Sequence, residues 1–388
     1  MFEQSTDTLE KLGASTTARE ISQQPELWIE TQALVAQAQT QLTDYFTKLS
    51  NAAGGKKIHV IFTGAGTSQY VGDTLVPYLT QHGDKQFIFH SFGTTDIVSS
   101  PLEYLFPDEP TLLVSFARSG NSPESTAAVK LADQIVNSLF HLTITCAADG
   151  QLAKNSQENP HNFLLLMPER ANDAGFAMTG SFTCMLLSAL LVFDTTTDEL
   201  KNTFITEIAQ IGQEILKKDQ AINNLVAHDF SRLIYLGSGS LSGAAREAQL
   251  KILELTAGKV ATLFDSSMGF RHGPKSFVTS QTLVVGLVSN NSYTRQYDLD
   301  VLEEVRTDEI ALNVVAISQP GENMYSGENC LLPSTSFVIP DAYIALPMIL
   351  VAQIISLATA IKLGNTPDTP SPSGTVNRVV KGVIIHKY

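Results

Sequence analysis

One unit of sequence, an apolar strand followed by a polar turn and a helix, occurs twice in this chain, and such a duplication constrains the fold more than any single residue. The first copy covers residues 58–75, IHVIFTGAGTSQYVGDTL, and the second covers residues 233–250, LIYLGSGSLSGAAREAQL. Three later apolar stretches of the first half also have counterparts in the second half. These pairs are 111–122 with 282–292, 142–150 with 313–321, and 162–169 with 335–342. We therefore expect both halves to share one order of strands, turns and helices.

Apolar strands that alternate with helices are typical of parallel sheets whose two faces are covered by helices. The sequence therefore predicts an α/β protein with two tandem, doubly wound parallel-sheet domains, at residues 51–197 and 229–364. A helical arm, residues 1–50, is expected before them, and a helical linker, residues 198–228, between them. The tail, residues 365–388, is expected to be extended, because its Pro-rich beginning cannot form a helix or a central strand.

Charge and cysteine content limit the partners and the compartment. Lys and Arg total 25 against 39 Asp and Glu, and this net charge of −14 opposes binding to nucleic acid or to an anionic membrane. The three cysteines form no CxxC pair, so the sequence predicts neither a disulfide framework nor a zinc site. The first ten residues carry acids instead of a basic and then apolar signal. A cytoplasmic protein is expected.

One apolar stretch, residues 343–361, has no charged residue and nearly reaches the length of a membrane span. Pro347, Gln353 and Ser356 interrupt it. We therefore expect a buried interface helix here, and no membrane as a partner.

Two strand-to-helix turns, GAGTS (64–68) and ARSGNS (117–122), are rich in Gly, Ser and Thr. Backbone N–H groups at a helix N-terminus, together with hydroxyl groups, can hold a phosphate. The alternative is that these hydroxyl groups only cap helices. Dinucleotide binding is not supported, because Gln69 stands where the GxGxxG pattern needs its third glycine, and neither turn contains a Walker motif. A phosphorylated small molecule is the expected ligand class.

Ionisable residues that could carry chemistry lie in the second half. Glu247, Lys251 and Glu254 are three or four residues apart, so they share one face of an expected helix. The same spacing is typical of a solvated face with salt bridges. His272 precedes Gly and Pro in an expected loop, and Lys381 lies in the tail. Taken alone, each of these residues is more typical of a surface position than of a site.

Five motifs in order resemble the sugar isomerase (SIS) proteins: EIxxQP at 20–25, GxGTS at 64–68, RSGNS at 118–122, LKxxELT at 250–256 and RHGP at 271–274. The resemblance covers nearly the whole chain and implies two flavodoxin-like SIS domains. Their tandem order resembles the isomerase half of glucosamine-6-phosphate synthase. The segments SFARSGNSPES (115–125) and GFRHGPKS (269–276) are most similar to the branch called tagatose-6-phosphate ketose/aldose isomerase or galactosamine-6-phosphate deaminase/isomerase.

The resemblance implies roles for individual residues. Ala117 replaces a serine and Arg118 a glutamine of the synthase pattern, and Arg118 can offset the lost hydroxyl group with a charged contact. Glu254 is implied as the proton-shuttling carboxylate, with Lys251 as its helical neighbour. The sugar-phosphate-binding positions fall on Gly66, Thr67, Ser68, Ser119, Gly120 and Ser122, with Arg118 beside them.

His272 is implied as the ring-opening histidine and Lys381 as the tail lysine of the site. In similar proteins the histidine loop reaches a partner subunit, so a homodimer or a higher homo-oligomer is expected. The implied chemistry requires no metal and no other cofactor.

The first cysteine is Cys146, so the chain is expected to lack the glutamine-hydrolysing domain of the synthase. Without an ammonia source, the reaction is expected to release ammonia: galactosamine 6-phosphate would give tagatose 6-phosphate. Two alternatives stay open, a plain aldose–ketose isomerase of a sugar phosphate such as tagatose 6-phosphate, and a non-catalytic sugar-phosphate sensor. Residue types alone do not distinguish a galacto from a gluco substrate, because pocket geometry determines that selectivity.

Overall fold

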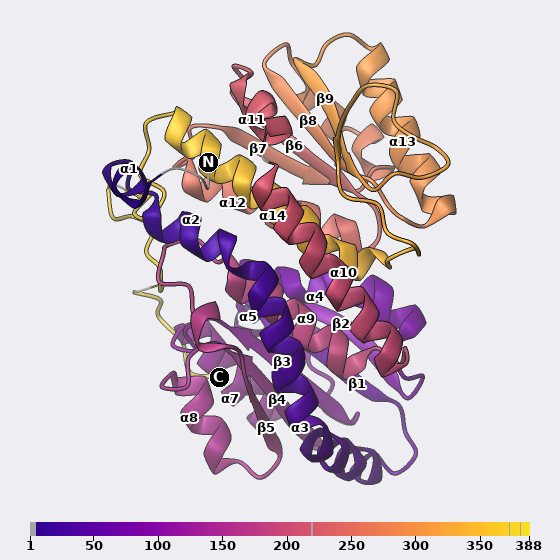
Figure 1. Ribbon diagram of the computed structural model, residues 1–388. Helices are drawn as coiled ribbons and strands as arrows, with labels where there is room; N and C mark the ends of the chain where they lie inside the picture. The colour runs from indigo at the N-terminus through magenta and orange to yellow at the C-terminus, as the bar shows by residue number, and fades with distance from the viewer. Residues whose placement is uncertain (1–4, 219, 372, 381) are drawn as a thin grey trace. The chain divides into compact units, whose positions relative to one another are not determined.

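The computed structural model describes residues 5–218, 220–371, 373–380 and 382–388, apart from the side chain of residue 158. The chain forms two compact units, each with its own sheet (Figure 1). The first-sheet unit contains Leu27–Asp173, Gly180–Lys201 and the chain from Gly374 onward. The second-sheet unit contains the chain up to Glu26, Ala174–Thr179 and Asn202–Ser373.

The first-sheet unit has five parallel strands in the order β2-β1-β3-β4-β5. This order is the flavodoxin-like one, in which a ligand site is expected at the carboxyl ends of the first and third strands. The predicted doubly wound parallel sheet is confirmed for this half. The strands are β1 (Ile58–Gly64), β2 (Phe87–Gly93), β3 (Thr111–Ala117), β4 (Leu139–Thr145) and β5 (Asn162–Leu166).

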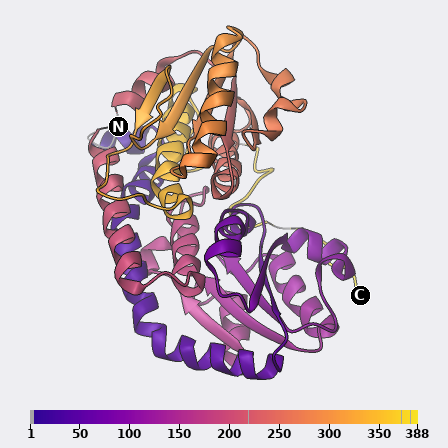
Figure 2. The same cartoon turned by 90° about the vertical axis from the view of Figure 1, so that its right-hand side faces the viewer.

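Helices cover both faces of this sheet. Successive residues of a strand point to opposite faces, so apolar residues on both faces need to be covered. Ile61 of β1 packs in one buried cluster with Leu113, Ile97 and Leu131, whereas the ring of Phe62 contacts Phe193 on the opposite face. Figure 2 shows the sheet with its helices from the side. The helices are α3 (Gln24–Ala53), α4 (Thr67–His82), α5 (Thr94–Ser99), α6 (Pro101–Tyr104), α7 (Pro123–Ile135), α8 (Gln151–Glu158) and α9 (Gly180–Phe193).

The second-sheet unit repeats this architecture, with five parallel strands in the order β10-β9-β8-β6-β7. Taken from the other edge, this order is the same as that of the first sheet, so the predicted duplication is confirmed. The strands are β6 (Arg232–Gly237), β7 (Ala261–Asp265), β8 (Thr282–Leu287), β9 (Asn313–Ser318) and β10 (Glu328–Leu331). The helices are α1 (Thr6–Lys11), α2 (Ser15–Ser22), α10 (Asp198–Lys217), α11 (Gln220–Ala227), α12 (Ser240–Leu255), α13 (Ser292–Thr307) and α14 (Asp341–Lys362), with short 3₁₀ turns at Gly269–Arg271 and Pro274–Phe277.

One predicted strand is wrong. The sequence predicts residues 335–342 as the counterpart of 162–169, but the fifth strand of the second sheet is β10, Glu328–Leu331. The backbone N–H of Leu332 still donates to the carbonyl of Ser318, and Pro333, which has no N–H group, follows directly. Because proline cannot continue a hydrogen-bonded ladder, the strand ends there and residues 335–340 run outside the sheet.

Helix α14 contains the apolar stretch that nearly reaches the length of a membrane span. Every residue from Ala342 to Ala360 is buried, and α14 packs against α12, α11 and α2 within the second-sheet unit. It is long and apolar enough to cross a membrane, but it forms the core of this unit. The prediction of a buried helix is confirmed.

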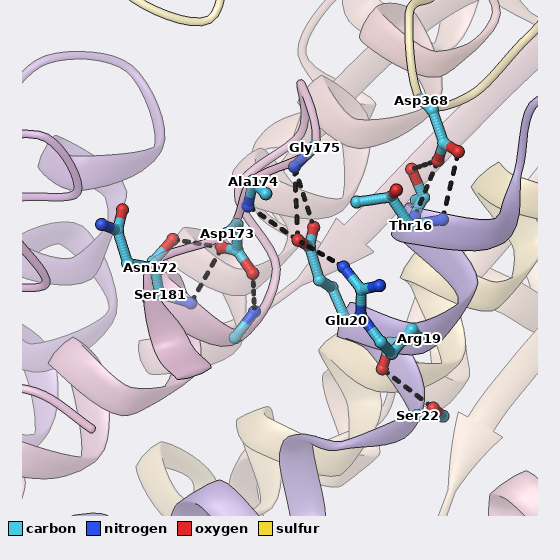
Figure 3. Close-up of polar contacts among 12 residues, drawn as sticks. Thr16, Arg19, Glu20, Ser22, Asn172, Asp173, Ala174, Gly175, Ser181 and Asp368 are labelled. Carbon is cyan, nitrogen blue, oxygen red and sulfur yellow. Dashed lines mark hydrogen bonds and ion pairs between the residues drawn. The ribbon is translucent and has the colours of Figure 1, made fainter. Parts of the chain in front are cut away.

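The EIxxQP motif has a structural role at Glu20. Its side chain is 3% exposed, and its carboxylate accepts hydrogen bonds from the backbone N–H groups of Ala174, at 2.7 Å, and Gly175, at 3.2 Å (Figure 3). A Cβ on Gly175 would lie 2.9 Å from that carboxylate, so a larger residue there would displace the Glu20 side chain. Nearby in the same unit, Asp368 accepts from the backbone N–H of Thr17 at 2.8 Å. Both carboxylates therefore hold separate segments of the chain against α2.

Replacing Glu20 with Ala should lower the free energy of unfolding by about 2 kcal/mol, because the buried N–H of Gly175 and the part-buried N–H of Ala174 lose a charged acceptor. Urea unfolding, followed by circular dichroism, measures the change. The control is Glu10→Gln on the exposed part of α1, which should change the midpoint little. Equal stability of the Glu20 variant and the control would contradict this role.

Candidate active site

Two glycines shape the turn that joins β1 to α4. Gly66 has φ +56, in the left-handed region that side chains rarely adopt, and it is the N-cap of α4. A Cβ on Gly64 would lie 2.5 Å from the Cβ of Ser68, so the helix can start only where the strand ends in glycine. Thr67 and Ser68 are buried in the first turn of α4. The turn therefore places two hydroxyl residues at the carboxyl end of β1.

The turn that joins β3 to α7 lies at the same edge, because β3 is the parallel neighbour of β1. Gly120 has φ +65, which bends the chain, and Ser122 is the N-cap of α7. Within the described residues, the Ser122 side chain makes no capping hydrogen bond to α7. The Ser119 hydroxyl accepts from the backbone N–H of Asn121 at 3.3 Å. The interpretation of Ser122 as only a helix cap is therefore not supported.

Arg118 connects the C-terminal tail of the chain to this turn by a hydrogen bond. Its side chain is buried, and its Nη2 donates to the backbone carbonyl of Arg378 at 2.7 Å. Arg378 in turn donates from Nε to the carbonyl of Asp173 at 3.0 Å and from Nη2 to the Asn172 side chain at 3.1 Å. Arg378 could not be predicted from the sequence, because its partners are distant in the chain and meet it only in the folded protein. The predicted Lys381 lies outside the described residues.

Helix α12 carries a buried lysine between two carboxylates. Lys251 Nζ lies 2.7 Å from Glu254 Oε2 and 3.3 Å from Glu247 Oε1. The side chains of Lys251 and Glu247 are 1% and 0% exposed, whereas that of Glu254 is 23% exposed. The solvated face that the spacing also allowed is therefore wrong, and Glu254 is the one of the two carboxylates that can reach a ligand.

The charges on this helix stabilise one another. Burial lowers the pKa of Lys251, but Glu247 and Glu254 raise it, and the net result is a pKa above the ordinary lysine value. Lys251 therefore stays protonated at neutral pH and can orient the Glu254 carboxylate. Glu247 was not predicted as a site residue, although its distance of four residues from Lys251 was the available signal.

His272 lies on the same unit as Glu254, in a loop between two short 3₁₀ turns. Its side chain is exposed. The loop is held to α13 by Arg271 Nε, which lies 2.6 Å from Glu304 Oε2, and by Lys275 Nζ, which lies 2.6 Å from Asp308 Oδ2. Among the described residues, no hydrogen bond or ion pair joins His272 to Glu254.

The predicted residues therefore fall into two groups. The hydroxyl turns and Arg118 belong to the first-sheet unit, whereas Lys251, Glu254 and His272 belong to the second-sheet unit. Each group is placed by the carboxyl ends of strands or by the helix that follows them. Within the described residues, no three His, Cys, Asp or Glu side chains are grouped as metal ligands would be.

Comparisons with known proteins agree with this fold. The SIS domain family matches residues 55–193. The chain is 45% identical over 375 residues to the D-galactosamine-6-phosphate deaminase AgaS of Escherichia coli, covering 96% of each chain. It is 41% identical to the protein of the same name from Shewanella sp. strain ANA-3, covering 99% of this chain and 95% of that one. A crystal structure of tagatose-6-phosphate ketose/aldose isomerase from Escherichia coli superposes with a TM-score of 0.88 at 41% identity, covering 99% of this chain and 98% of that one. The chain therefore belongs to the SIS domain family, in the group that contains these deaminases and ketose/aldose isomerases.

Proposed function

We propose that this protein converts galactosamine 6-phosphate and water to tagatose 6-phosphate and ammonia. The observation that carries the proposal is the arrangement on α12, where a protonated, buried Lys251 orients Glu254 and leaves part of its carboxylate exposed. A carboxylate held in this way can act as a general base. The names of the relatives that are more than 40% identical over nearly the full chain supply the substrate.

The reaction needs one proton to move between two neighbouring carbons. The sugar ring opens first, and His272 is the proposed group that moves the proton from the anomeric hydroxyl to the ring oxygen. Glu254 then removes the proton from C2 and returns it to C1, while the C1 oxygen gains a proton and the amino nitrogen loses one, so that the 2-amino aldose becomes a ketose imine. Water adds to the C2 imine carbon, the C–N bond breaks, and ammonia leaves. Thr67, Ser68, Ser119, Ser122 and Arg118 are the proposed groups for the phosphate.

The proposed substrate can be tested by comparing two amino sugars. Purified protein is given galactosamine 6-phosphate or glucosamine 6-phosphate, and ammonia is measured with a coupled dehydrogenase assay. We expect ammonia from the galacto sugar at a higher kcat/KM than from the gluco sugar. A higher kcat/KM for the gluco sugar would change the proposed substrate but not the proposed reaction. Ammonia release from neither sugar would reject the proposed deaminase activity.

A plain aldose–ketose isomerase is the second candidate, because the similar crystal structure from Escherichia coli carries the name tagatose-6-phosphate ketose/aldose isomerase. The same carboxylate could move a proton between C1 and C2 of a neutral sugar phosphate. Incubation of tagatose 6-phosphate in deuterated water would separate the two candidates. Conversion to an aldose phosphate with deuterium at C2, without any ammonia release from amino sugars, would favour the isomerase.

The hydroxyl of Ser122 provides a test of phosphate binding, because it does not cap α7. Replacing Ser122 with Ala should raise KM about tenfold, since one hydrogen bond to a charged phosphate is worth roughly 1.5 kcal/mol or more. Thermal stability should not change. The matched control is Ser99→Ala, an exposed serine at the end of α5, which should leave KM unchanged. A fall in stability without a change in KM would support the capping interpretation instead.

We further propose that the protein works in the cytoplasm as a homodimer or a higher homo-oligomer. The proposal is supported by the resemblance to proteins whose histidine loop reaches a partner subunit, and by the exposed position of His272. Light scattering coupled to gel filtration measures the mass in solution. A mass near the 42.0 kDa of one chain would reject the dimer.

A further inference from the structure

Arg118 is a buried cation at the turn that joins β3 to α7. Its side chain is 6% exposed, and its Nη2 donates to the backbone carbonyl of Arg378 at 2.7 Å. A guanidinium group carries five N–H donors in a rigid plane, so each acceptor that it meets helps to fix the direction of that plane. A carbonyl group orients the cation without cancelling its positive charge. The position of the Arg378 backbone therefore helps to set how Arg118 faces a ligand.

The side chain of Arg378 fixes that backbone. Its Nε donates to the backbone carbonyl of Asp173 at 3.0 Å, and its Nη2 donates to the same carbonyl. Nη2 also donates to the side-chain oxygen of Asn172 at 3.1 Å. Two neighbouring donors on one carbonyl, with a third contact beside it, require the planar fork of an arginine, which lysine lacks. One residue of the tail thus joins two segments, because its side chain binds residues 172–173 and its carbonyl accepts from Arg118.

Residues 172–173 are themselves held in the core of the first-sheet unit. Asp173 is completely buried, and its carboxylate accepts from the backbone N–H groups of Gly180 at 3.1 Å and Ser181 at 3.0 Å. Figure 3 shows Asn172 and Asp173 beside Ser181, at the start of α9. Helix α9 is mostly buried and packs against α4, whose first turn carries two of the hydroxyl groups proposed for the phosphate. Through α9, the anchor of the tail is therefore connected to a helix of the proposed phosphate site.

The two arginines also make this turn locally cationic. Burial raises the pKa of the Cys146 thiol, directly after β4, and the charge of Asp173 raises it further, whereas the charges of Arg118 and Arg378 lower it. Both arginines therefore lie near Cys146, and β4 is the strand next to β3. Two positive charges against one negative charge attract an anion, although the whole chain has a net charge of −14. Arg378 thus contributes charge as well as position.

We propose that Arg378 is a positioning residue for the phosphate of the substrate and acts through Arg118. Its side chain fixes the tail on Asn172 and Asp173, and the carbonyl of the fixed tail holds the Arg118 guanidinium in the orientation that binds the phosphate. Arg378 therefore raises the affinity for a sugar phosphate without touching it. The inference rests on the proposed function, because that function assigns Arg118 to the phosphate.

A double-mutant cycle with Arg118 tests the inference. Isothermal titration calorimetry measures the binding of galactitol 6-phosphate, an open-chain sugar phosphate that has no carbonyl group and cannot isomerise, to the full chain. Arg378→Ala should weaken binding about tenfold and Arg118→Gln about a hundredfold, because hydrogen bonds between charged groups are strong. In protein that already carries Arg118→Gln, Arg378→Ala should cause no further loss, because the residue through which it acts is absent.

Two results of this cycle would overturn the inference: additive losses in the double variant, or an unchanged affinity in Arg378→Ala. Absence of binding to the wild-type chain would instead reject the proposed phosphate site, and the inference with it. The assay needs no turnover, so a failure of the proposed reaction is seen separately, in the ammonia assay.

Replacing Arg378 with Lys tests the same role in a protein that keeps the positive charge. The ammonium group can donate to the Asp173 carbonyl but lacks the fork that also reaches Asn172. We expect an affinity about threefold below that of wild type, and no effect of Arg378→Lys in protein that carries Arg118→Gln. If Arg378→Lys bound galactitol 6-phosphate no better than Arg378→Ala, the positioning role would be wrong.

Turnover kinetics distinguish positioning from a general loss of structure. The proposed proton transfer between C2 and C1 belongs to Glu254, so Arg378→Ala should raise KM for galactosamine 6-phosphate about tenfold and lower kcat by less than about threefold. A variant that loses structure would instead lose kcat and thermal stability together. The matched control is Arg306→Ala on α13, an arginine that is 45% exposed and ion-paired with Glu303, and it should leave KM unchanged. A fall in kcat with an unchanged KM, or an equal rise of KM in the control, would contradict the positioning role.

Discussion

Replacing Glu254 with Gln is expected to lower kcat for ammonia release by about a thousandfold, because a general base commonly contributes 10²–10⁴-fold. The amide keeps the size of the side chain and its contact with Lys251, but it cannot accept the proton from C2. Binding of the sugar phosphate should change little, since the proposed phosphate contacts lie elsewhere. Steady-state kinetics and calorimetry measure the two effects separately.

A matched control for this variant is Glu214→Gln on α10, a glutamate whose side chain is 40% exposed and forms an ion pair with Lys218. It should keep full activity. If Glu254→Gln retained more than a tenth of the wild-type kcat, Glu254 would not be the base. A wild-type chain that binds sugar phosphates but never turns them over would support the sensor instead.

The second large effect is expected at Lys251, which is almost completely buried between Glu247 and Glu254. Replacing it with Met leaves the buried Glu247 without its cation, and removing one partner of a buried pair costs about 3–5 kcal/mol of unfolding free energy. The reaction should also stop, because Glu254 loses the group that orients it. Chemical unfolding and the ammonia assay measure the two losses.

A double variant separates stability from activity at this site. Lys251→Met combined with Glu247→Gln removes the uncompensated charge, so much of the lost unfolding free energy should return while the reaction stays absent. Equal destabilisation in the single and double variants would contradict the buried pair.

The same lysine predicts a pH dependence. Its folded pKa is raised above the ordinary value, so its contribution to stability is complete below about pH 10.4 and is lost as the pH rises through the folded pKa. The wild-type protein should therefore lose stability in this alkaline range more steeply than Lys251→Met does. Parallel slopes for the two proteins would contradict the raised pKa.

Much of the fold could be predicted because its signals are local. An apolar run followed by Gly-x-Gly and a helix predicts a strand and a helix-initiating turn from a few residues, and the pattern occurs twice at Gly64 and Gly237. Strand β10 gave no such signal, because Glu328–Leu331 is short, half exposed and stabilised by its pairing with β9. Edge strands of this kind depend on pairing with the next strand of the sheet, as β7 does with β6.

The candidate site could be predicted only in part for a similar reason. Spacing placed Glu247, Lys251 and Glu254 on one face of a helix, but it did not show what covers that face. Helix α14, far along the chain, packs against α12 and helps to form the buried core around it. Burial of Lys251 therefore depends on tertiary structure. The contact of Arg118 with Arg378 has the same origin, since the two residues are 260 positions apart.

The central claim is tested most directly by the stoichiometry of the products from galactosamine 6-phosphate. Purified protein is incubated with the substrate, and ammonia and tagatose 6-phosphate are measured in the same sample over time. The proposed reaction predicts that both products form at equal rates, and that neither forms with the Glu254→Gln variant. A ketose phosphate without ammonia, or ammonia release that does not depend on Glu254, would contradict it.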